Sequence, residues 1–255
     1  MDEAPTTLIA PDEPQPVTVT NYDGRSPFVI VSDHAGKYLP RGLQMLGLNQ
    51  AECDRHIAWD IGAGAVSTML GDALDAIVIR QNYSRLVIDC NRTPGSETSI
   101  VELSELTTVP GNIGLRDDVI GARVREIFRP YHDRIARELD QRSQVGRPTA
   151  LIAVHSFTPV FKDAARPWHV GVLYNRDSRL AAKLIGLLRR EPGLVVGDNE
   201  PYKVTDESDY TIPVHGEQRD LPHVAIEIRQ DLIAHEAGQQ KWAALLARLL
   251  PLTYQ

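Results

Sequence analysis

Side chains capable of chemistry follow several short apolar runs of this 255-residue sequence, at the point where each run ends. The run PFVIVSD at 27–33 is followed by His34, and the run TALIAVH at 149–155 ends in His155. Because open α/β sheets bind ligands beyond the carboxyl ends of their parallel strands, we expect these side chains to converge on one edge of a sheet. The other residues of this kind are Asp33, Asp89, Asn91, Arg92, Glu227 and Arg229.

Two histidines and a carboxylate are the ligand set of a catalytic zinc ion that keeps its fourth position open for water. Such an ion lowers the pKa of bound water to about 7 and polarises a carbonyl group. His34 and His155 are the candidate histidine ligands, and Asp60, in HIAWDIGA, is the best candidate for the carboxylate. Glu227 is then available as a separate general base and acid.

Asn91 and Arg92 could donate hydrogen bonds to an oxyanion or to a substrate carboxylate, since arginine offers a bidentate fork. Structural interpretations stand beside these functional ones. A histidine after a strand is more often a loop residue than a ligand, and Asp60 could be the N-cap of the helix that follows it. Glu227 could pair with Arg229, which shares its face of the strand. The repetition of such residues at strand ends favours a site.

The elements that must position these residues alternate between strands and helices. This alternation predicts an α/β fold with a central, mostly parallel sheet covered by helices on both faces. The Thr-, Ser-, Gly- and Pro-rich segment 93–115 is predicted to be a long loop, and such loops are often functional or mobile. The expected strands are 27–33, 75–80, 84–91, 149–155, 168–174, 193–197 and 223–229, and the expected helices are 41–52, 60–74, 116–144 (divided near Pro130), 178–190 and 236–250.

The composition and charge of the chain exclude several classes of protein. Lys and Arg number 27 against 34 Asp and Glu, and a net charge of −7 lacks the basic field that non-specific nucleic-acid binding needs. Two cysteines cannot form a disulfide framework and fit a reducing compartment. The sequence begins without a secretory signal and contains no apolar run long enough to span a membrane. We therefore expect a cytoplasmic protein that binds neither nucleic acid nor membrane.

The chain is predicted to form one domain with an N-terminal extension. Residues 1–26 hold four prolines and little periodicity, which indicates an extended or loosely packed arm. No change of composition divides residues 27–255, which we take as a single α/β domain. GxSxG, P-loop and GxGxxG motifs are missing, so a serine hydrolase or a nucleotide-binding protein is not expected. Among the remaining histidines we single out His215, near a turn before the 223–229 run.

Seven segments of the sequence resemble the N-formylglutamate amidohydrolase family, over residues 27–235. The resemblance implies a three-layer fold similar to the zinc carboxypeptidases and phosphorylase/hydrolase-like proteins, with one zinc or other divalent ion at the strand ends. The segments are SDHAGKYLP (32–40), HIAWDIGA (56–63), YSRLVIDCNR (83–92), HSFTP (155–159), GVLYNRD (171–177), DNEPY (198–202) and LPHVAIEIRQDLI (221–233).

In those relatives a histidine and an acidic ligand come first along the chain, followed by an Asn-Arg pair, a second histidine and a late glutamate. The matching residues here are His34, Asp60, Asn91, Arg92, His155 and Glu227. One position departs from the carboxypeptidase pattern, because the acidic ligand normally lies three residues after the first histidine, where this chain has Lys37. Asp60 is therefore an inference, and Asp33 or Asp89 could replace it.

The resemblance implies hydrolysis of the amide in an N-formyl or other N-acyl amino acid, with N-formyl-L-glutamate giving formate and glutamate, as in histidine catabolism. Such a small, dianionic substrate needs cations, for which Arg85, Arg92 and Arg176 are candidates, with Asn175 and Tyr174 as neutral partners. Arg176 could instead form a structural salt bridge with Asp177 or Asp209 at the start of a helix. Two alternatives remain open: a deacylase with a different range of N-acyl amino acids, and a binding protein that does not hydrolyse its ligand.

Overall fold

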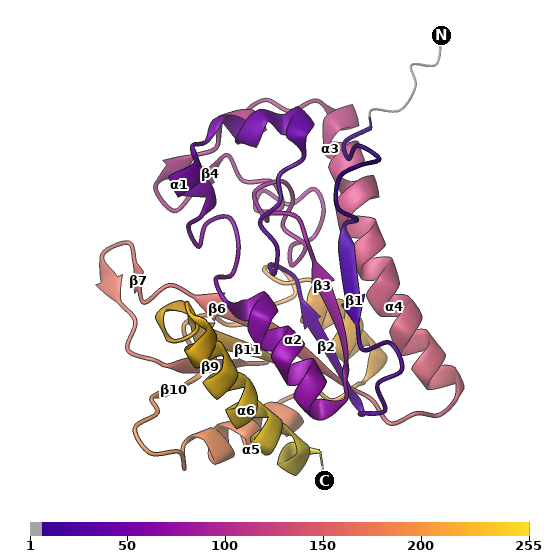
Figure 1. Cartoon of the computed structure of the whole chain (residues 1–255), viewed down its shortest axis with the longest axis vertical. Coiled ribbons are helices and arrows are strands. Elements are labelled where there is room, and N and C mark those ends of the chain that lie inside the picture. The colour runs from indigo at the N-terminus through magenta and orange to yellow at the C-terminus, as the bar shows by residue number, and fades with distance from the viewer. Residues whose placement is uncertain (1–6, 255) are drawn as a thin grey trace.

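A seven-stranded mixed sheet forms the centre of the computed structural model, which describes residues 7–254 (Figure 1). Its strand order is β1-β3-β2-β6-β11-β9-β10. The four central strands β3, β2, β6 and β11 are parallel to one another. On one edge β1 runs antiparallel to β3. On the other edge β9 runs antiparallel to β11, and β10 is parallel to β9. The strands are β1 (Val17–Thr20), β2 (Phe28–Ser32), β3 (Ile77–Gln81), β6 (Ala150–Phe157), β9 (Val170–Leu173), β10 (Val196–Asp198) and β11 (His223–Arg229).

The central strands are apolar along their whole length because helices cover both faces of the sheet. Phe28 and Ile30 of β2 pack into one core with α2 (Ala63–Leu74), α5 (Arg179–Leu188) and α6 (Glu236–Thr253). Figure 1 shows α2 and α6 side by side over that face. Val29 and Val31 point the other way, into a second core with α4 (Arg129–Gln144). The predicted three-layer α/β class is confirmed.

The long helix predicted over 116–144 is divided, as expected near Pro130. It consists of α3 (Asp117–Arg123), a π-helical turn (Val124–Phe128) and α4. Proline lacks the N–H that an α-helix needs at an interior position, so the hydrogen-bond pattern changes just before it.

The strand predicted over 84–91 is wrong. This segment forms turns, with the Val87 amide donating to the Ser84 carbonyl at 2.9 Å and the Ser84 hydroxyl donating to the Ala58 carbonyl at 2.8 Å. Leu86, Val87 and Ile88 are buried in the core that contains α4. The apolar run therefore reflects burial from all sides and not strand pairing.

The helix predicted over 41–52 is also different in the structure. A 3₁₀ stretch (Arg41–Gly47) ends in four consecutive residues with positive φ, Gln44 to Gly47, and the short helix α1 (Gln50–Cys53) follows. Helix α2 begins at Ala63, three residues later than residue 60. Its N-cap Gly62 has φ +82°, and a Cβ there would lie 2.2 Å from the Ile233 carbonyl oxygen, so only glycine fits.

Three strand pairs were not expected from the sequence. Strand β1 lies within the predicted N-terminal arm and pairs with β3, while Met1–Thr6 lie outside the described residues, so the arm boundary at residue 26 stays a prediction. The loop 93–115 contains a hairpin of β4 (Leu103–Ser104) and β5 (Thr107–Thr108). A second hairpin consists of β7 (Val160–Phe161) and β8 (Ala164–Ala165).

Shorter elements complete the described chain. They are the 3₁₀ turns Pro110–Asn112, Glu217–Arg219 and Gln230–Leu232 and the π-helical turn Ile212–Gly216. Within residues 7–254, none of the helices is both long and apolar enough to cross a membrane.

Candidate active site

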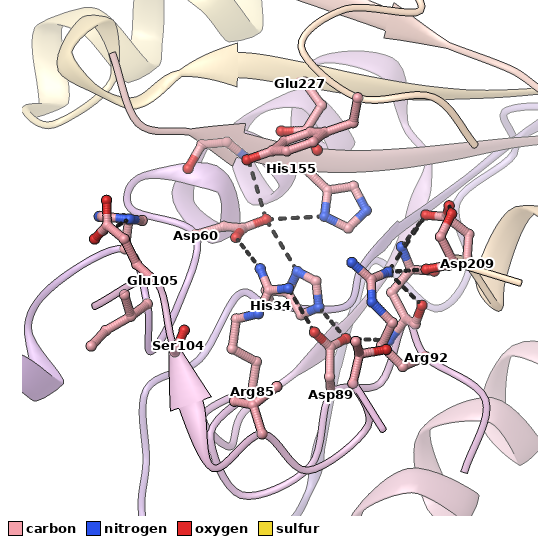
Figure 2. A pocket seen from close by; sticks show the side chains of 18 of the residues that line it. His34, Asp60, Arg85, Asp89, Arg92, Ser104, Glu105, His155, Asp209 and Glu227 are labelled. Atoms are coloured by element: carbon pink, nitrogen blue, oxygen red, sulfur yellow. Dashed lines mark hydrogen bonds and ion pairs between the residues drawn. The ribbon is translucent and has the colours of Figure 1, made fainter. Parts of the chain in front are cut away.

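The carboxyl ends of three neighbouring parallel strands carry the centre of the site. His34 lies just beyond β2, His155 lies in β6, and Glu227 lies in β11 directly opposite His155 in the strand register. Asp60 comes from the turn before α2, and its backbone amide donates to the His34 carbonyl at 2.9 Å. Figure 2 shows these side chains directed toward one another. The strand-end arrangement expected from the sequence is therefore present.

His34, Asp60 and His155 form a buried group with the donor set of a divalent metal site. One ligand atom from each residue lies within 4.8 Å of the others. Asp60 Oδ2 lies 3.0 Å from His155 Nδ1 and 3.4 Å from His34 Nδ1. His34 Nδ1 is buried and has no hydrogen-bond partner among the described residues. An orphaned imidazole nitrogen beside a carboxylate and a second imidazole fits a metal such as zinc.

Asp33 and Asp89 lie behind the two histidine rings. Asp89 Oδ1 lies 2.7 Å from His34 Nε2, and Asp33 Oδ2 lies 3.1 Å from His155 Nε2. The Nδ1 atoms face Asp60 and the Nε2 atoms face these outer carboxylates, which is the usual arrangement around ligating histidines. Of the three carboxylates considered from the sequence, only Asp60 lies on the side where both histidines present Nδ1.

The carboxylates determine the charge of the group. Burial and the Arg85 charge lower the pKa of His34, but Asp89 and Asp60 outweigh them, so the pKa is raised. Burial also lowers the pKa of His155, and contacts with Asp33 and Asp60 raise it well above its ordinary value. The site therefore attracts positive charge, whether protons or a metal ion.

Glu227 differs from Asp33, Asp60 and Asp89 because no basic side chain within residues 7–254 forms an ion pair with it. Its side chain is buried, and its Oε2 atom has no hydrogen-bond partner among the described residues. Burial raises the pKa of Glu227 to about 7, although the nearby His155 opposes the shift. The structural alternative of a pair with Arg229 is not present, since Arg229 binds Asp231 at 2.8 Å. A buried carboxyl poised near neutral pH is suited to proton transfer.

The N-cap alternative for Asp60 is not present either. The N-cap of α2 is Gly62, and the Asp60 carboxylate instead accepts a hydrogen bond from the Ser156 backbone amide at 3.2 Å in addition to its contact with His155. Two neighbouring residues of β6 therefore hold the Asp60 carboxylate through the same oxygen, Oδ2.

A cavity of about 410 Å³ opens onto this group. Arg85 and Arg92 both line it. Arg85 donates to Asp89 at 2.6 Å and lies 3.6 Å from Asp60, so these two carboxylates hold its guanidinium beside the His34–Asp60–His155 group. Arg92 binds the backbone carbonyls of Asn91 and Ser208 and lies 3.8 Å from Asp209.

Asn91 lines the cavity but its amide is used to hold the chain. Its side-chain nitrogen donates to Asp209 at 2.9 Å, and its oxygen accepts from the backbone amides of Tyr210 and Thr211 at 3.1 and 3.0 Å. Asn91 therefore ties the segment that packs on Arg92 to the turn that carries Asp89.

The other three predicted substrate-binding residues are not brought to the cavity. Arg176 and Asn175 bind Asp206 at 2.7 and 3.1 Å, and Arg176 also pairs with Glu217, outside the cavity lining. The Tyr174 hydroxyl donates to Asp198 at 2.9 Å. Arg176 does form structural salt bridges, but its partners are Asp206 and Glu217 and not the Asp177 or Asp209 considered from the sequence.

Sequence reasoning did not assign several residues that line the cavity. Tyr202 was inside the quoted DNEPY segment and Lys203 follows it, so proximity to that segment was the available signal. The hairpin residues had no signal, because short strands in a polar loop leave no periodicity. These additional lining residues are His56, Leu103, Ser104, Glu105, Phe161, Tyr202, Lys203 and Asp209.

Comparisons with known proteins agree with this geometry. Residues 26–234 match the family model of N-formylglutamate amidohydrolase. A gene product, Atu2144, from Agrobacterium tumefaciens has a solved structure that is 34% identical, with a TM-score of 0.93, over 96% of this chain and 97% of that chain. The N-formylglutamate amidohydrolase from Ralstonia eutropha JMP134 is 17% identical, with a TM-score of 0.66, over 93% of this chain and 97% of that chain. A comparison with curated proteins gave no match.

Proposed function

The chain belongs to the N-formylglutamate amidohydrolase family and is a hydrolase acting on amide bonds, and on this premise we propose that it cleaves the N-acyl amide of an acidic amino acid. N-formyl-L-glutamate, giving formate and glutamate, is the representative substrate. The observation that carries the proposal is the unpartnered, buried Glu227 carboxyl beside the His34–Asp60–His155 group.

His34, Asp60 and His155 are proposed to hold one zinc or other divalent ion per chain. Support comes from the orphaned Nδ1 of His34 and from the outer carboxylates that orient both imidazoles. When bound, such an ion supplies a Lewis acid that polarises a carbonyl and acidifies water. Protonation competes with metal for the same imidazole nitrogens, so the ion takes the place of protons that the carboxylates otherwise favour.

Glu227 is proposed to move the proton during hydrolysis. With a pKa of about 7, its carboxyl is partly ionised at neutral pH and can both accept and return a proton. It accepts the proton of the attacking water as the new C–O bond forms. It then delivers that proton to the amide nitrogen, and the C–N bond breaks to release the amine and the carboxylic acid.

Arg92 is proposed to bind a substrate carboxylate. One of its terminal nitrogens is used by backbone carbonyls, and Asp209 is 3.8 Å away, so the guanidinium retains donors for a ligand. Arg85 lies next to Asp60 and is proposed to stabilise negative charge that develops at the scissile carbonyl. Asn91 forms three hydrogen bonds to residues 209–211, and it is proposed to position this segment beside Arg92.

The Glu227→Gln variant tests this proposal. We expect kcat on N-formyl-L-glutamate to fall by about 10²–10⁴-fold, because the amide cannot take up the proton. The metal content, measured by elemental analysis on protein purified without chelators, should stay near that of the wild type. Asp231→Asn, an exposed carboxylate four residues further along the chain, is the matched control. Wild-type turnover by Glu227→Gln would show that Glu227 is not the base.

A further inference from the structure

The cavity extends beyond the catalytic group in two directions. Arg92 and Asp209 lie on one side of His34 in Figure 2, and Ser104 and Glu105 lie on the opposite side. If a substrate carboxylate binds Arg92 and its amide lies at the centre, the acyl group points toward the Ser104 end. That end is the subject of the inference.

The size of the cavity exceeds the need of a formyl group. Its volume of about 410 Å³ falls within the range of roughly 300–1,000 Å³ found for sites that enclose drug-sized ligands. N-formyl-L-glutamate is considerably smaller than such ligands, and its acyl group carries only a hydrogen beyond the carbonyl carbon. A formyl substrate would therefore leave the Ser104 end unfilled.

Apolar side chains from the two hairpins line the cavity. Leu103, on the β4–β5 hairpin, is 59% exposed although it is in the cavity wall, and Phe161 comes from the β7–β8 hairpin. Ile57 also lines the cavity, from the turn that follows α1, but its side chain is buried. Exposed apolar surface inside a concave site favours a ligand that covers it.

The β4–β5 hairpin is fixed in place by its turn residue. Glu105 adopts a positive φ of 55°, which is unfavourable for a residue other than glycine or asparagine. Its carboxylate binds Arg55 at 2.7 Å, and Arg55 also donates to the Thr107 hydroxyl at 2.8 Å. The carboxylate is therefore neutralised, and its contact with Arg55 keeps Leu103 in the wall.

The second hairpin is fixed in a similar way. The Arg166 guanidinium lies over the Phe161 ring at 4.6 Å and over the Tyr202 ring at 4.7 Å, and it donates to the Tyr202 hydroxyl at 2.8 Å. These contacts join the β7–β8 hairpin to the segment that carries Tyr202. Contacts within the chain therefore hold both hairpins in place.

We propose that the end of the cavity between Leu103 and Phe161 is an acyl subsite that accepts a short aliphatic acyl chain. The preferred substrates are then N-acyl acidic amino acids with several acyl carbons, in place of the N-formyl compound. The inference rests on the proposed function, because the amide must lie at the catalytic group for the acyl chain to reach this wall.

A chain-length series tests the subsite. We would measure kcat/KM of the metal-loaded enzyme for the N-formyl, N-acetyl, N-butyryl and N-hexanoyl derivatives of L-glutamate. Each methylene that becomes buried should raise kcat/KM by about fourfold, up to the chain length that fills the subsite. Hydrolysis of the N-formyl compound with a steady decrease along the series would overturn the subsite and leave the proposed function intact.

Two variants of the β4–β5 hairpin test whether Leu103 causes the dependence of kcat/KM on acyl-chain length. Leu103→Asp should lower the butyryl-to-formyl ratio of kcat/KM by about tenfold or more, since the charge is placed against the acyl chain. Leu106→Asp is the matched control, because Leu106 is 77% exposed at the tip of the same hairpin and does not line the cavity. Equal ratios in both variants would contradict the assignment of Leu103.

If no member of the series is hydrolysed, the proposed function is wrong. The subsite can then still be tested by measuring how tightly the same compounds bind. Calorimetric titration of the same compounds into the Glu227→Gln variant then gives Kd for each chain length. A Kd that decreases with chain length and loses this dependence in a Glu227→Gln/Leu103→Asp protein supports the subsite. A Kd independent of chain length overturns it.

Discussion

Two pairs of buried histidines in this molecule have the same spacing and opposite electrostatics. The ring centroids of His34 and His155 lie 5.2 Å apart, and those of His132 and His215 also lie 5.2 Å apart. The pKa values of the first pair are raised, whereas those of His132 and His215 are lowered to about 4 and about 3. Burial of an imidazole therefore does not determine its charge.

The second pair forms a neutral hydrogen-bonded chain. His132 Nε2 lies 2.7 Å from the Cys90 carbonyl oxygen, which can only accept, so Nε2 carries the proton. His132 Nδ1 is then an acceptor and takes the hydrogen bond from His215 Nε2 at 3.0 Å. A further proton on His132 Nδ1 would break this bond. Burial lowers both pKa values, and the opposing charge of Asp33 does not outweigh it.

The difference lies in the carboxylates. Asp33, Asp60 and Asp89 contact the first pair at both ring nitrogens, while the second pair contacts a carbonyl and aromatic rings. The first arrangement concentrates positive charge, and the second keeps two imidazoles neutral within an apolar layer. This contrast predicts that only the first pair binds metal.

The largest expected effect is the loss of a histidine from the first pair. His34→Ala should lower the metal content from about one ion per chain to near zero and reduce kcat/KM by more than about a hundredfold, since loss of an outer partner alone typically costs 10–100-fold. His215→Gln is the matched variant of the second pair and should keep the wild-type metal content. Elemental analysis and kinetics measure both. Metal loss in His215→Gln alone would reverse the assignment of the pairs.

An outer carboxylate should have a smaller effect than a ligand. Asp89→Asn keeps the shape of the side chain but removes the charge that faces His34 Nε2 at 2.7 Å and Arg85 at 2.6 Å. We expect the metal affinity, measured by chelator competition, to fall about 10–100-fold. Asp206→Asn removes a carboxylate from an exposed arginine pair outside the cavity and is the control. An unchanged affinity in Asp89→Asn would mean that Asp89 does not orient the ligand.

The convergence of the candidate catalytic residues was predictable from the sequence because it depends on local patterns. The apolar runs that became β2, β6 and β11 end in His34, His155 and Glu227, and parallel pairing brings such ends together. The opposite roles of Asp60 and Asp89 were not predictable, because they depend on which ring nitrogen each carboxylate faces.

The failures of prediction share a cause. The run at 84–89 has the composition of a strand, yet it is buried in turns between other elements. Arg176 had the charge for substrate binding, but its partners Asp206 and Glu217 come from segments 30 or more residues away in the sequence. Contacts between distant segments decide these cases, and a local pattern does not contain them.

The second pair predicts how stability depends on pH. The unfolded chain protonates each histidine with a pKa near 6.5, whereas the folded chain does so only at about 4 for His132 and about 3 for His215. As the pH falls from 7 to 5, the unfolded state takes up protons that the folded state does not. The contribution of each of these two histidines to the free energy of unfolding should therefore decrease by roughly 1–2 kcal/mol.

The first pair and Glu227 act in the opposite direction over this range. Their pKa values are raised, so the folded state holds protons that the unfolded state lacks, and the stability they contribute increases as the pH falls from 7. Carboxylates with lowered pKa, such as Asp33, lose their contribution only below about pH 4. These contributions are common to the wild type and to His132→Gln, so the difference between the two slopes reports His132. Denaturant titrations at pH 7, 6 and 5 should show a shallower slope for His132→Gln than for the wild type. The exposed His235→Gln is the control. An identical slope in His132→Gln would argue against a neutral His132 in the folded protein.

The smallest expected effect concerns Thr211, which reaches the first pair only through Asp33. Its hydroxyl donates to Asp33 Oδ1 at 2.7 Å, while Asp33 Oδ2 faces His155. Thr211→Val keeps the shape but leaves a buried carboxylate oxygen without its donor, which should lower the free energy of unfolding by about 1–3 kcal/mol. The metal affinity should fall by less than about tenfold, because His155 keeps its contact with Asp33. Thr211→Ser should restore both values, since the hydroxyl alone carries the effect. A loss of affinity as large as that of Asp89→Asn would mean that the hydroxyl, and not the Asp33 charge, sets the orientation of His155.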